Sequence, residues 1–488
     1  MSEVRPTAAP PRRLLYEPMS PDDARALLER ALSALETRGV RVASERARDL
    51  LEGAGATVDR SAGTARVPAP LANGALDRAP AAFMIAGRQP ERDATVSAEA
   101  PLLAAAAAAA AVLDVESGER REATARDVID ACRLADALFE VAAVWAPPAQ
   151  AGGARARGCP PALEPCLTGT TKHVIFTDVA DVAAAEVLVG AAAAVAGSAG
   201  EARRRPPFSA LERSPWPDDE AVAAIDAALT CAEAGLPVGF LLPLAGEESA
   251  SDVAAAATAV AAAALAAGAL VQLAIPGAPF VAPLLPAVVA SATSAGPAPA
   301  TTAGPAAYLA TLAASQILGR VHLPVATGFA AGPATGAPRW EAAVDNVFLG
   351  LTGALSRSGL VCGAGLLDGG DAYAPEQLML DVETFSYAAA VGAGMAVDDE
   401  TIAAETIAAV GAGGNALGQK HTRRHMKDVW RTRLFDRASY EAWSHAGRPG
   451  AADRARERAA EILATHDVPP PEAETVATLR RIIEKAGL

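Results

Sequence analysis

From Lys172 onward the chain repeats one pattern five times, a short apolar run followed by a longer stretch of helical character. The runs do not alternate polar and apolar residues, which is typical of strands covered on both faces of a sheet. Parallel neighbours need a connection of a dozen or more residues, and a helix supplies it. The pattern therefore predicts parallel strands joined by helices. The runs are VIFTDV, LPVGFLLPLA, ALVQLAIPG, LPVATGF and LVCGAGLLDG, and the helices are expected at 181–196, 251–267, 305–318, 340–357 and 375–391.

A closed barrel is favoured over an open doubly wound sheet. No Gly-rich dinucleotide turn opens any of these helices, and GAGG at Gly411 precedes no apolar helix. The predicted fold class is α/β, a (β/α)8 TIM-type barrel with an N-terminal helical extension and a C-terminal helical tail. We expect four parts: a disordered N-terminus at 1–13, a helical cap with a small hairpin at 14–80, the barrel at 81–422 and the helical extension at 423–488.

Helix-capping and turn residues support these boundaries. Ser20 followed by Pro21 predicts the start of a helix, because Ser caps the first turn and Pro suits its first position. Residues 56–68 resemble a hairpin around Ser61-Ala62-Gly63. Thr124 with Asp127 three residues later predicts a capping box that opens another helix.

Charge and composition exclude several classes of protein. The formal net charge of −15 argues against a general nucleic-acid binder, which needs a basic face. The five cysteines are too scattered for a disulfide framework and the N-terminus has no apolar signal region, so a cytoplasmic protein is expected. The Ala-rich runs at 102–113 and 254–270 are interpreted as buried helices and not as membrane spans.

The loops after the strands are the expected position of the chemistry, because barrel active sites lie at the carboxyl ends of the strands. Glu247 falls in one such loop, and Glu341 and Asp345 lie four residues apart on the helix that follows another. The two carboxylates share one helix face, so they could serve a site or be an ordinary solvated pair.

The stretch from Gly411 to Trp443 concentrates imidazoles and positive charge in an acidic chain. His421 and His425 have a spacing that can hold a metal on a helix, but the sequence lacks the carboxylate of a His-Glu-x-x-His motif. A structural role for His421 is the alternative. The cysteines also lack the His-x-Cys spacing of a zinc-dependent thiol methyltransferase, so no bound metal of its own is expected.

One set of segments, taken in order along the chain, carries a resemblance to a known family. The segments are RQPERD, LDVESGERREATARDVIDACRLADAL, TTKHV, RRRPPFSALERSPW, LPVGFLLPLAG, VQLAIPGAPF, LVCGAGLLDGGDAYAPEQLMLDVE and GAGGNALGQKHTRRHMKDVWRTRLFDRASYEAW. Together they resemble the trimethylamine methyltransferase superfamily, in its branch without pyrrolysine that includes glycine betaine methyltransferase. The resemblance extends from near Leu15 to the C-terminus. It implies a (β/α)8 barrel that passes a methyl group from a methylated amine to the Co(I) corrinoid (cobalamin) of a small partner protein.

The resemblance assigns expected roles to residues. A quaternary ammonium is an activated leaving group, so the enzyme needs no nucleophile and must hold the methyl in line while aromatic faces or carboxylates favour the cation. We expect Glu247, Asp345 and the stretch from Phe329 to Trp340 to meet with Phe280 in one pocket at the barrel mouth. For each aromatic residue, core packing is the alternative role. The expected residues are Phe280, Phe329, Trp340 and Tyr373 as substrate contacts, Glu341, Asp345 and Glu247 as catalytic counter-charges, and His421 and Thr422 facing the corrinoid.

Two functional classes stay open. The first is a corrinoid-dependent methyltransferase acting on a quaternary or tertiary amine such as a betaine. The second is a catalytically lapsed barrel that binds a small ligand or partner only, since the loop after LPVATG has Ala330, Ala331 and Pro333 where the family carries polar residues. Barrels of this size often associate, so a homo-oligomer is also expected.

Overall fold

The computed structural model describes most of the chain. The described residues are 13–107, 109–146, 150–151, 154–155, 159–177, 179, 181–212, 221–242, 253–284, 305–328 and 340–487.

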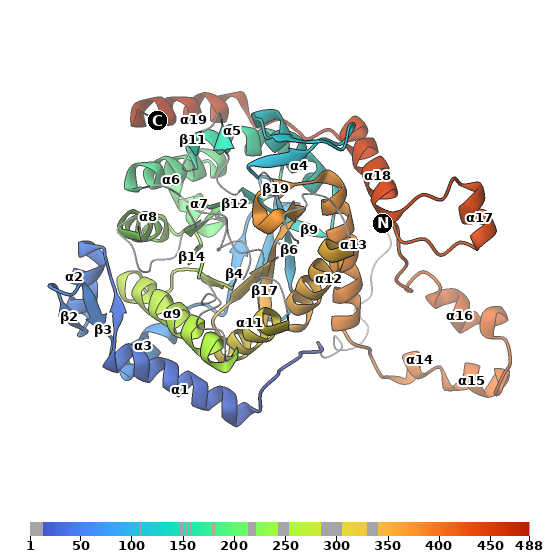
Figure 1. Cartoon of the computed structure of the whole chain (residues 1–488), viewed down its shortest axis with the longest axis horizontal. Coiled ribbons are helices and arrows are strands. Elements are labelled where there is room, and N and C mark those ends of the chain that lie inside the picture. Colours follow the sequence, from blue (N-terminus) through green and yellow to red (C-terminus); the bar gives the residue numbers. More distant parts are fainter. Residues whose placement is uncertain are drawn as a thin grey trace.

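Eight parallel strands close into a barrel at the centre of the molecule (Figure 1). Their order around the barrel follows the chain, and the last strand pairs with the first through Leu360 and Leu102. This closure confirms the predicted (β/α)8 fold. The strands are β6 (Leu102–Ala106), β9 (Val141–Ala146), β12 (His173–Thr177), β13 (Phe208–Glu212), β14 (Val238–Phe240), β15 (Phe280–Pro283), β16 (Val325–Gly328) and β17 (Ser358–Ala364).

A helix follows each barrel strand and covers the outside of the barrel (Figure 1). Two helix starts follow directly from sequence: the Asp181 side chain accepts from Ala184 N–H, and Thr124 and Asp127 form the predicted capping box. The helices are α4 (Ala125–Ala137), α5 (Pro160–Gly169), α6 (Val182–Ala196) with the short α7 (Ala199–Arg204), α8 (Ala221–Glu233), α9 (Val253–Ala274), α11 (Pro305–Leu318), α12 (Trp340–Leu355) and α13 (Pro375–Gly392).

Two sequence interpretations are wrong. The Ala-rich run at 102–113 is not a buried helix: its first part is barrel strand β6, and its end is β7 (Ala111–Leu113). Alanine favours helices intrinsically, but here the pairing with β9 and β17 overrides that preference. The run ALVQLAIPG is not a strand either, because its apolar residues form the buried end of α9, and the strand begins at Phe280.

α9 is, among the described helices, long and apolar enough to cross a membrane. However, 61% of its apolar window is buried inside the molecule. It therefore serves as a core helix of the barrel shell, as the sequence predicted.

The N-terminal extension packs against the barrel shell. The predicted first helix is α1 (Pro21–Thr37), in which Ser20 accepts from Asp23 N–H, and it contacts α9. The predicted hairpin is also present, formed by β2 (Thr57–Asp59) and β3 (Thr64–Arg66), with β1 (Val40–Arg41) added beside β3 and α2 (Glu45–Gly53) and α3 (Ala69–Leu76) nearby.

Two further small sheets flank the two ends of the barrel. The hairpin of β4 (Ala82–Ile85) and β5 (Ala94–Ser97) lies where the barrel strands begin, and the carbonyl of Ala86 contacts His173 Nδ1 at 3.3 Å. At the other end, β18 (Leu366–Leu367) and β19 (Ala372–Tyr373) extend from β17, and β7 and β8 (Arg120–Glu122) extend from β6. These four strands form one sheet at the carboxyl ends of the barrel strands.

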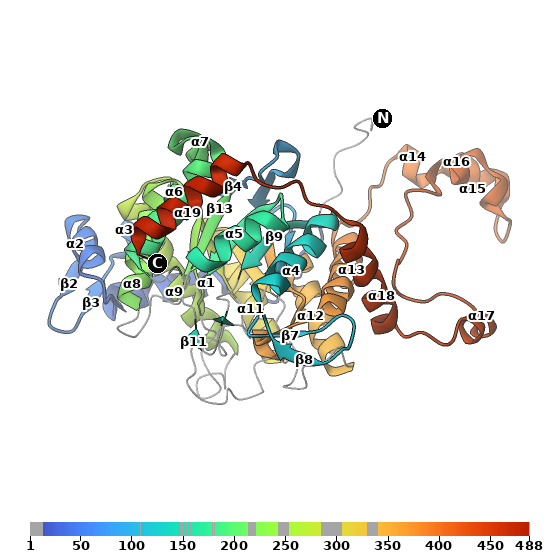
Figure 2. The ribbon, with the colours of Figure 1, turned by 90° about the horizontal axis from the view of Figure 1, so that it is seen from above.

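Residues 393–449 form an arm that projects from the barrel (Figures 1 and 2). The arm carries α14 (Asp399–Ile402), α15 (Ala404–Val410), α16 (Lys420–His425) and α17 (Tyr440–His445), and none of these four helices has a buried residue. The chain then returns to the barrel with α18 (Ala451–Thr465), which packs on α13, and α19 (Ala473–Ala486), which packs on α6. The domain boundaries expected from sequence stay predictions.

Candidate functional site at the carboxyl end of the barrel

The strand register separates side chains that face the helices from those that face the barrel interior. A Cβ on Gly268 of α9 would lie 3.4 Å from the Phe280 ring, and one on Gly353 of α12 would meet Val361 and Thr327. Phe280, Thr327 and Val361 therefore face outward. Because successive side chains of a strand point to opposite faces, their immediate neighbours face the interior.

Side-chain contacts between adjacent strands agree with this assignment of interior positions. His173 Nε2 contacts Ser209 Oγ at 2.6 Å, and Trp145 Nε1 donates a hydrogen bond to Thr177 Oγ1. Both pairs join neighbouring interior positions of adjacent strands. The described residues with interior register include Leu102, Ala104, Ala106, Ala143, Trp145, His173, Ile175, Thr177, Ser209, Leu211, Gly239, Val281, Pro283, Ala326, Gly328, Leu360 and Cys362.

Trp145 stands out among these interior residues. It is fully buried on the penultimate residue of β9, and Thr177, the last residue of β12, fixes its indole N–H. Among the described barrel strands no other Trp, Tyr or Phe has interior register, and the neighbouring positions are mostly Ala, Gly or Thr. The carboxyl end of the barrel thus holds one fixed, buried indole among small side chains.

The described interior positions carry no Asp, Glu, Lys or Arg. His173 lies at the opposite end, where burial lowers its pKa to about 4 and keeps the imidazole neutral. The Cys362 thiol is buried, and burial raises its pKa above the usual range. Among the described interior residues, the arrangement therefore suits binding of a cation by an aromatic face better than proton transfer or nucleophilic attack.

A buried polar cluster positions the chain after β17. Asp381 of α13 is fully buried, and its carboxyl group accepts hydrogen bonds from Gly365 N at 2.8 Å, Asn346 Nδ2 at 2.8 Å and Gln377 Nε2 at 2.7 Å. Burial raises the pKa of Asp381 to about 7. The cluster joins α12 and α13 to the start of the sheet at the carboxyl end of the barrel.

The predicted site residues do not meet in one place. Phe280 is fully buried at the start of β15 and packs outward against α9, far from the strand ends where chemistry is expected. Trp340 is 79% exposed and Glu341 is exposed, both at the first turn of α12. Asp345 turns toward α11, where the Tyr308 hydroxyl donates to its Oδ1 at 2.9 Å.

The remaining predicted residues are dispersed as well. Tyr373 is buried in β19 at the carboxyl end of the barrel, and its hydroxyl has no hydrogen-bond partner among the described residues. Glu247 and Phe329 lie outside the described residues. The structure therefore groups Trp340, Glu341 and Asp345 on one helix and places Phe280 and Tyr373 elsewhere.

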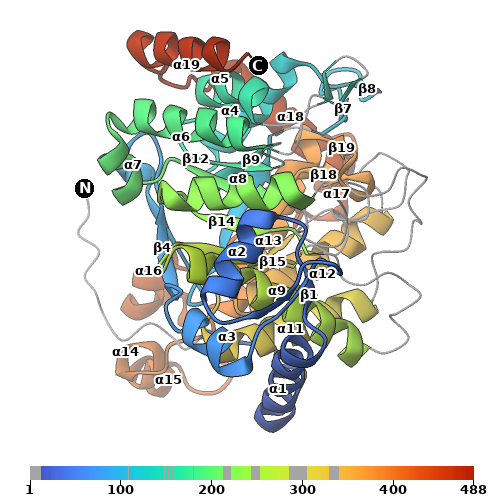
Figure 3. The same cartoon turned by 90° about the vertical axis from the view of Figure 1, so that its left-hand side faces the viewer.

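His421 and Thr422 lie on α16 of the arm. In Figures 2 and 3, α14, α15 and α16 lie on the side of the molecule where β4 lies, whereas β7 and β8 mark the opposite side. A role facing the corrinoid is thus not supported at the carboxyl end of the same chain. His421 Nε2 instead contacts the carbonyl oxygen of Glu400 at 2.8 Å.

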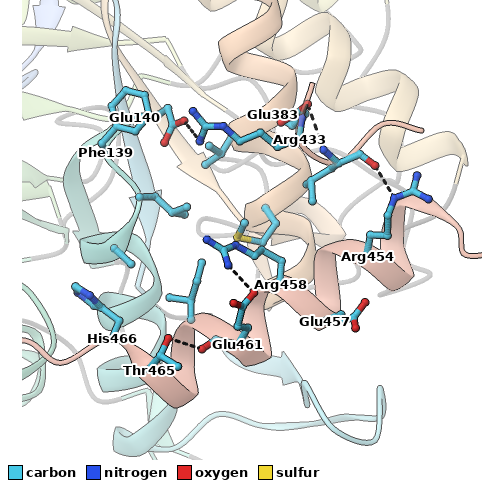
Figure 4. Close-up of a pocket in the computed structure, with 16 residues that line it drawn as sticks. Phe139, Glu140, Glu383, Arg433, Arg454, Glu457, Arg458, Glu461, Thr465 and His466 are labelled. Atoms are coloured by element: carbon cyan, nitrogen blue, oxygen red, sulfur yellow. Dashed lines mark hydrogen bonds and ion pairs between the residues drawn. The ribbon is translucent and has the colours of Figure 1, made fainter. Parts of the chain in front are cut away.

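A cavity of about 650 Å³ opens between the α4–β9 connection, α13 and α18 (Figure 4). Arg433 Nη1 donates to Glu140 at 2.6 Å, its backbone N–H donates to Glu383 at 2.8 Å, and Arg454 Nε donates to the carbonyl of Leu434 at 2.7 Å. The cavity adjoins Glu140, which precedes β9, so it lies at the amino ends of the strands. Its ion pairs secure the chain where it returns from the arm.

A closed barrel of eight parallel strands, each followed by a helix, defines the class of (β/α)8 barrels, whose active sites lie at the carboxyl ends of the strands. The sequence matches the model of the trimethylamine methyltransferase (MTTB) family over residues 4–486. The chain belongs to that family, which confirms the predicted resemblance and places it among methyltransferases.

Individual relatives agree with this assignment. Trimethylamine methyltransferase MttB of Desulfitobacterium hafniense is 28% identical over 468 residues, covering 96% of this chain and 93% of the relative. Glycine betaine methyltransferase of the same species is 31% identical over 125 residues, covering 25% of this chain and 26% of the relative. The solved monomethylamine methyltransferase MtmB of Methanosarcina barkeri aligns with a TM-score of 0.45 at 9% identity, over 96% of this chain and 92% of that one.

Trp145 is the candidate that sequence reasoning missed. It lies in VAAVWA, an Ala-rich run that sequence analysis did not identify as a strand. The available signal was a continuous apolar run of six residues directly after α4, which has the length of a buried strand.

Proposed function

We propose that this protein transfers a methyl group from a quaternary methylated amine, of the betaine type, to the corrinoid of a small partner protein. The observation that carries the proposal is the buried indole of Trp145 at the carboxyl end of the barrel. A methylated ammonium over the face of a Trp is attracted by the ring quadrupole, and Trp is the strongest of the aromatic residues in this role.

The described interior positions at this end carry no Asp, Glu, His, Lys or Arg, and burial raises the pKa of the one thiol there, Cys362. This favours a quaternary donor. When the C–N bond of a quaternary ammonium breaks, its electron pair stays on nitrogen and the product leaves as a neutral tertiary amine. No proton is needed, so no acid is required from the chain. An aliphatic tertiary amine is protonated in neutral water but loses that proton more easily when it is desolvated, whereas a quaternary ammonium keeps its charge.

The corrinoid, when bound to its partner protein, supplies Co(I), which accepts the methyl group. Ala106 and Gly328, at the carboxyl ends of β6 and β16, have interior register, and their small size fits a donor held near the barrel opening. The residues of this chain would orient the methyl group and exclude water from it. Trp145 is the contact proposed for the cation, and Thr177 is proposed as its positioning residue.

The lapsed barrel is the second candidate function. The observation that favours it is the position of the predicted counter-charges: Glu341 is exposed, and Asp345 is bonded to Tyr308 on the outside of the barrel. A barrel that only binds a ligand would keep the affinity provided by Trp145 without turnover.

A methyl-transfer assay separates the two candidates. The protein, with Co(I) cobalamin or its cognate corrinoid protein, is given a panel of betaines, tertiary amines and methylammonium compounds, and methyl-cobalamin is followed by absorbance. We expect turnover with at least one quaternary amine. Binding of a quaternary amine without turnover, with the cognate corrinoid protein present, supports the lapsed barrel. Turnover with a tertiary amine alone overturns the proposed substrate class.

We also propose that the protein is cytoplasmic and forms a homo-oligomer. The arm exposes large apolar side chains: Met395 is 80% exposed, Val397 70%, Leu417 65%, Ile407 64% and Val429 62%. Large apolar side chains exposed together on one projecting segment favour an interaction site there. In such an assembly the arm of one copy would lie against its neighbour.

A further inference from the structure

Three potential metal ligands come together on the arm. Glu400 on α14 and His421 and His425 on α16 each offer one ligand atom, and these atoms all lie within 4.8 Å of one another. The two histidines are one helical turn apart, and their ring centroids are 4.5 Å apart. The sequence showed only the histidine pair; the fold adds the carboxylate from 21 residues upstream.

The spacing fits direct coordination. His425 Nε2 and Glu400 Oε1 are 3.1 Å apart. Two ligands of a tetrahedral zinc ion, each about 2.0–2.1 Å from the metal, are roughly 3.3 Å apart. The pair is therefore near the ligand separation that a metal requires, and a small rotation of His421 away from the Glu400 carbonyl would present its nitrogen as the third ligand.

The partner of the other ring nitrogen of His425 suits metal binding as well. His425 Nδ1 lies 2.7 Å from the Asp428 carboxylate, which leaves Nε2 directed at Glu400. Histidines that bind metals usually donate their other ring N–H to a carboxylate or carbonyl, which fixes the tautomer and raises ligand basicity.

An ion-pair network is the competing explanation. Arg424 Nη1 donates to Glu400 Oε1 at 2.7 Å, and hydrogen bonds to Glu400 and Asp428 raise the pKa of His425. A protonated His425 could thus hold the arm without a metal. That explanation uses His421 only through its hydrogen bond to the Glu400 carbonyl, whereas a metal uses both rings in their neutral form.

The helices of the arm also require a stabilising interaction other than a hydrophobic core. α14, α15 and α16 contain no buried residue, so no hydrophobic core holds them together. Small units without a core commonly rely on a metal or disulfides. The described cysteines are all buried, and none lies on the arm.

We propose that Glu400, His421 and His425 form a site for a divalent cation of the zinc type that links α14 to α16. Nitrogen and carboxylate ligands in this number suit Zn²⁺, with water or a group from another copy completing the shell. The site is structural and distinct from methyl transfer, so it does not depend on the proposed function.

Calorimetric titration of tag-free, chelator-treated full-length protein with Zn²⁺ tests the site. We expect the wild type to bind one Zn²⁺ per chain at this site. His421→Ala and His425→Ala should each lose that binding. Asp428→Asn should weaken the Zn²⁺ affinity by about 10–100-fold, because the Asp428 carboxylate orients the ligand His425. His445→Ala is the matched control, because His445 is an exposed histidine of the arm outside the cluster, and it should bind as the wild type does.

Limited proteolysis of the same samples gives a second readout. Zn²⁺ should slow cleavage within residues 393–449 in the wild type and in His445→Ala but not in His421→Ala. Equal Zn²⁺ stoichiometry in the wild type and both histidine variants would overturn the proposal, as would an absence of Zn²⁺ binding to the wild type. Circular dichroism of each variant confirms that the barrel is folded.

Discussion

At the residue scale, the carboxyl group of Asp381 links stability to pH. Burial raises its pKa from 3.8 to about 7, so the folded state binds more protons than the unfolded state between these values. Stability contributed by this group is fully present below about pH 4 and is lost as pH rises through about 7. The three donors around the carboxyl group reduce this loss without reversing it.

Asp381→Asn removes that titration. The variant also loses one of the acceptors that Gly365, Asn346 and Gln377 use, which should cost about 1–3 kcal/mol. We expect a lower Tm than wild type at pH 5 and a smaller difference at pH 8. Asp399→Asn, at an exposed position of α14, should give the wild-type pH dependence. A Tm difference that grows with pH would contradict the assignment.

At the scale of elements, close contacts between helices and strands hold the barrel shell. A Cβ at Gly353 of α12 would lie 2.6 Å from Val361 Cγ2 of β17. Replacing Gly by Ala in a helix normally stabilises it by up to about 1 kcal/mol, but overpacking costs about 1–3 kcal/mol. We therefore expect Gly353→Ala to lower the Tm.

Gly74→Ala in α3 is the matched control, because a Cβ added at Gly74 would have nothing within 4 Å of it. Thermal melts should show an unchanged or higher Tm for this variant. If Gly353→Ala were as stable as Gly74→Ala, the inference that α12 packs tightly on β17 at Gly353 would be contradicted.

Phe280 distinguishes a core residue from a substrate contact. It packs between β15 and α9, beside Gly268. Phe280→Leu should lower the Tm while leaving the KM for the amine unchanged, because the side chain faces away from the barrel interior. Steady-state kinetics below the melting range check this, and a raised KM with an unchanged Tm would restore its predicted role in substrate binding.

The elements that could be predicted from sequence are those with clear capping residues or clear apolar runs. α1, α4 and α6 start at capping residues, and β12, β16 and β17 are apolar runs rich in branched side chains. β6, β9 and β13 were missed, because Ala-rich strands such as LLAAA and VAAVWA carry little β propensity of their own. Their strand state comes from pairing within the closed barrel, which no local pattern contains.

The candidate site was less predictable than the fold for a related reason. Interior and exterior positions of a barrel strand depend on register, which is set by partners distant in sequence. Phe280 and Trp145 are both buried aromatics at strand ends, and only the register shows that one faces α9 and the other the interior.

At the scale of the whole molecule, the arm at residues 393–449 exposes several large apolar side chains. Met395 and Val397 are almost fully exposed, and Trp430 stacks edge-on with Tyr387 of α13 near the base of the arm. We expect light scattering to show an oligomer. Val397→Asp with Met395→Asp should reduce its mass, whereas Glu474→Ala, at an exposed position of α19, should not. A monomeric wild type would contradict self-association.

The central claim is methyl transfer from a quaternary amine held at Trp145. The most direct measurement compares the rate of methyl-cobalamin formation for wild type, Trp145→Phe and Trp145→Leu with one quaternary amine and the cognate corrinoid protein. Loss of a cation–π contact that is desolvated is worth about 2 kcal/mol, roughly 30-fold in kcat/KM. We predict that Trp145→Leu loses at least that factor and that Trp145→Phe retains an intermediate rate, both with native circular dichroism. Equal rates in all three proteins would show that Trp145 does not hold the quaternary amine during methyl transfer.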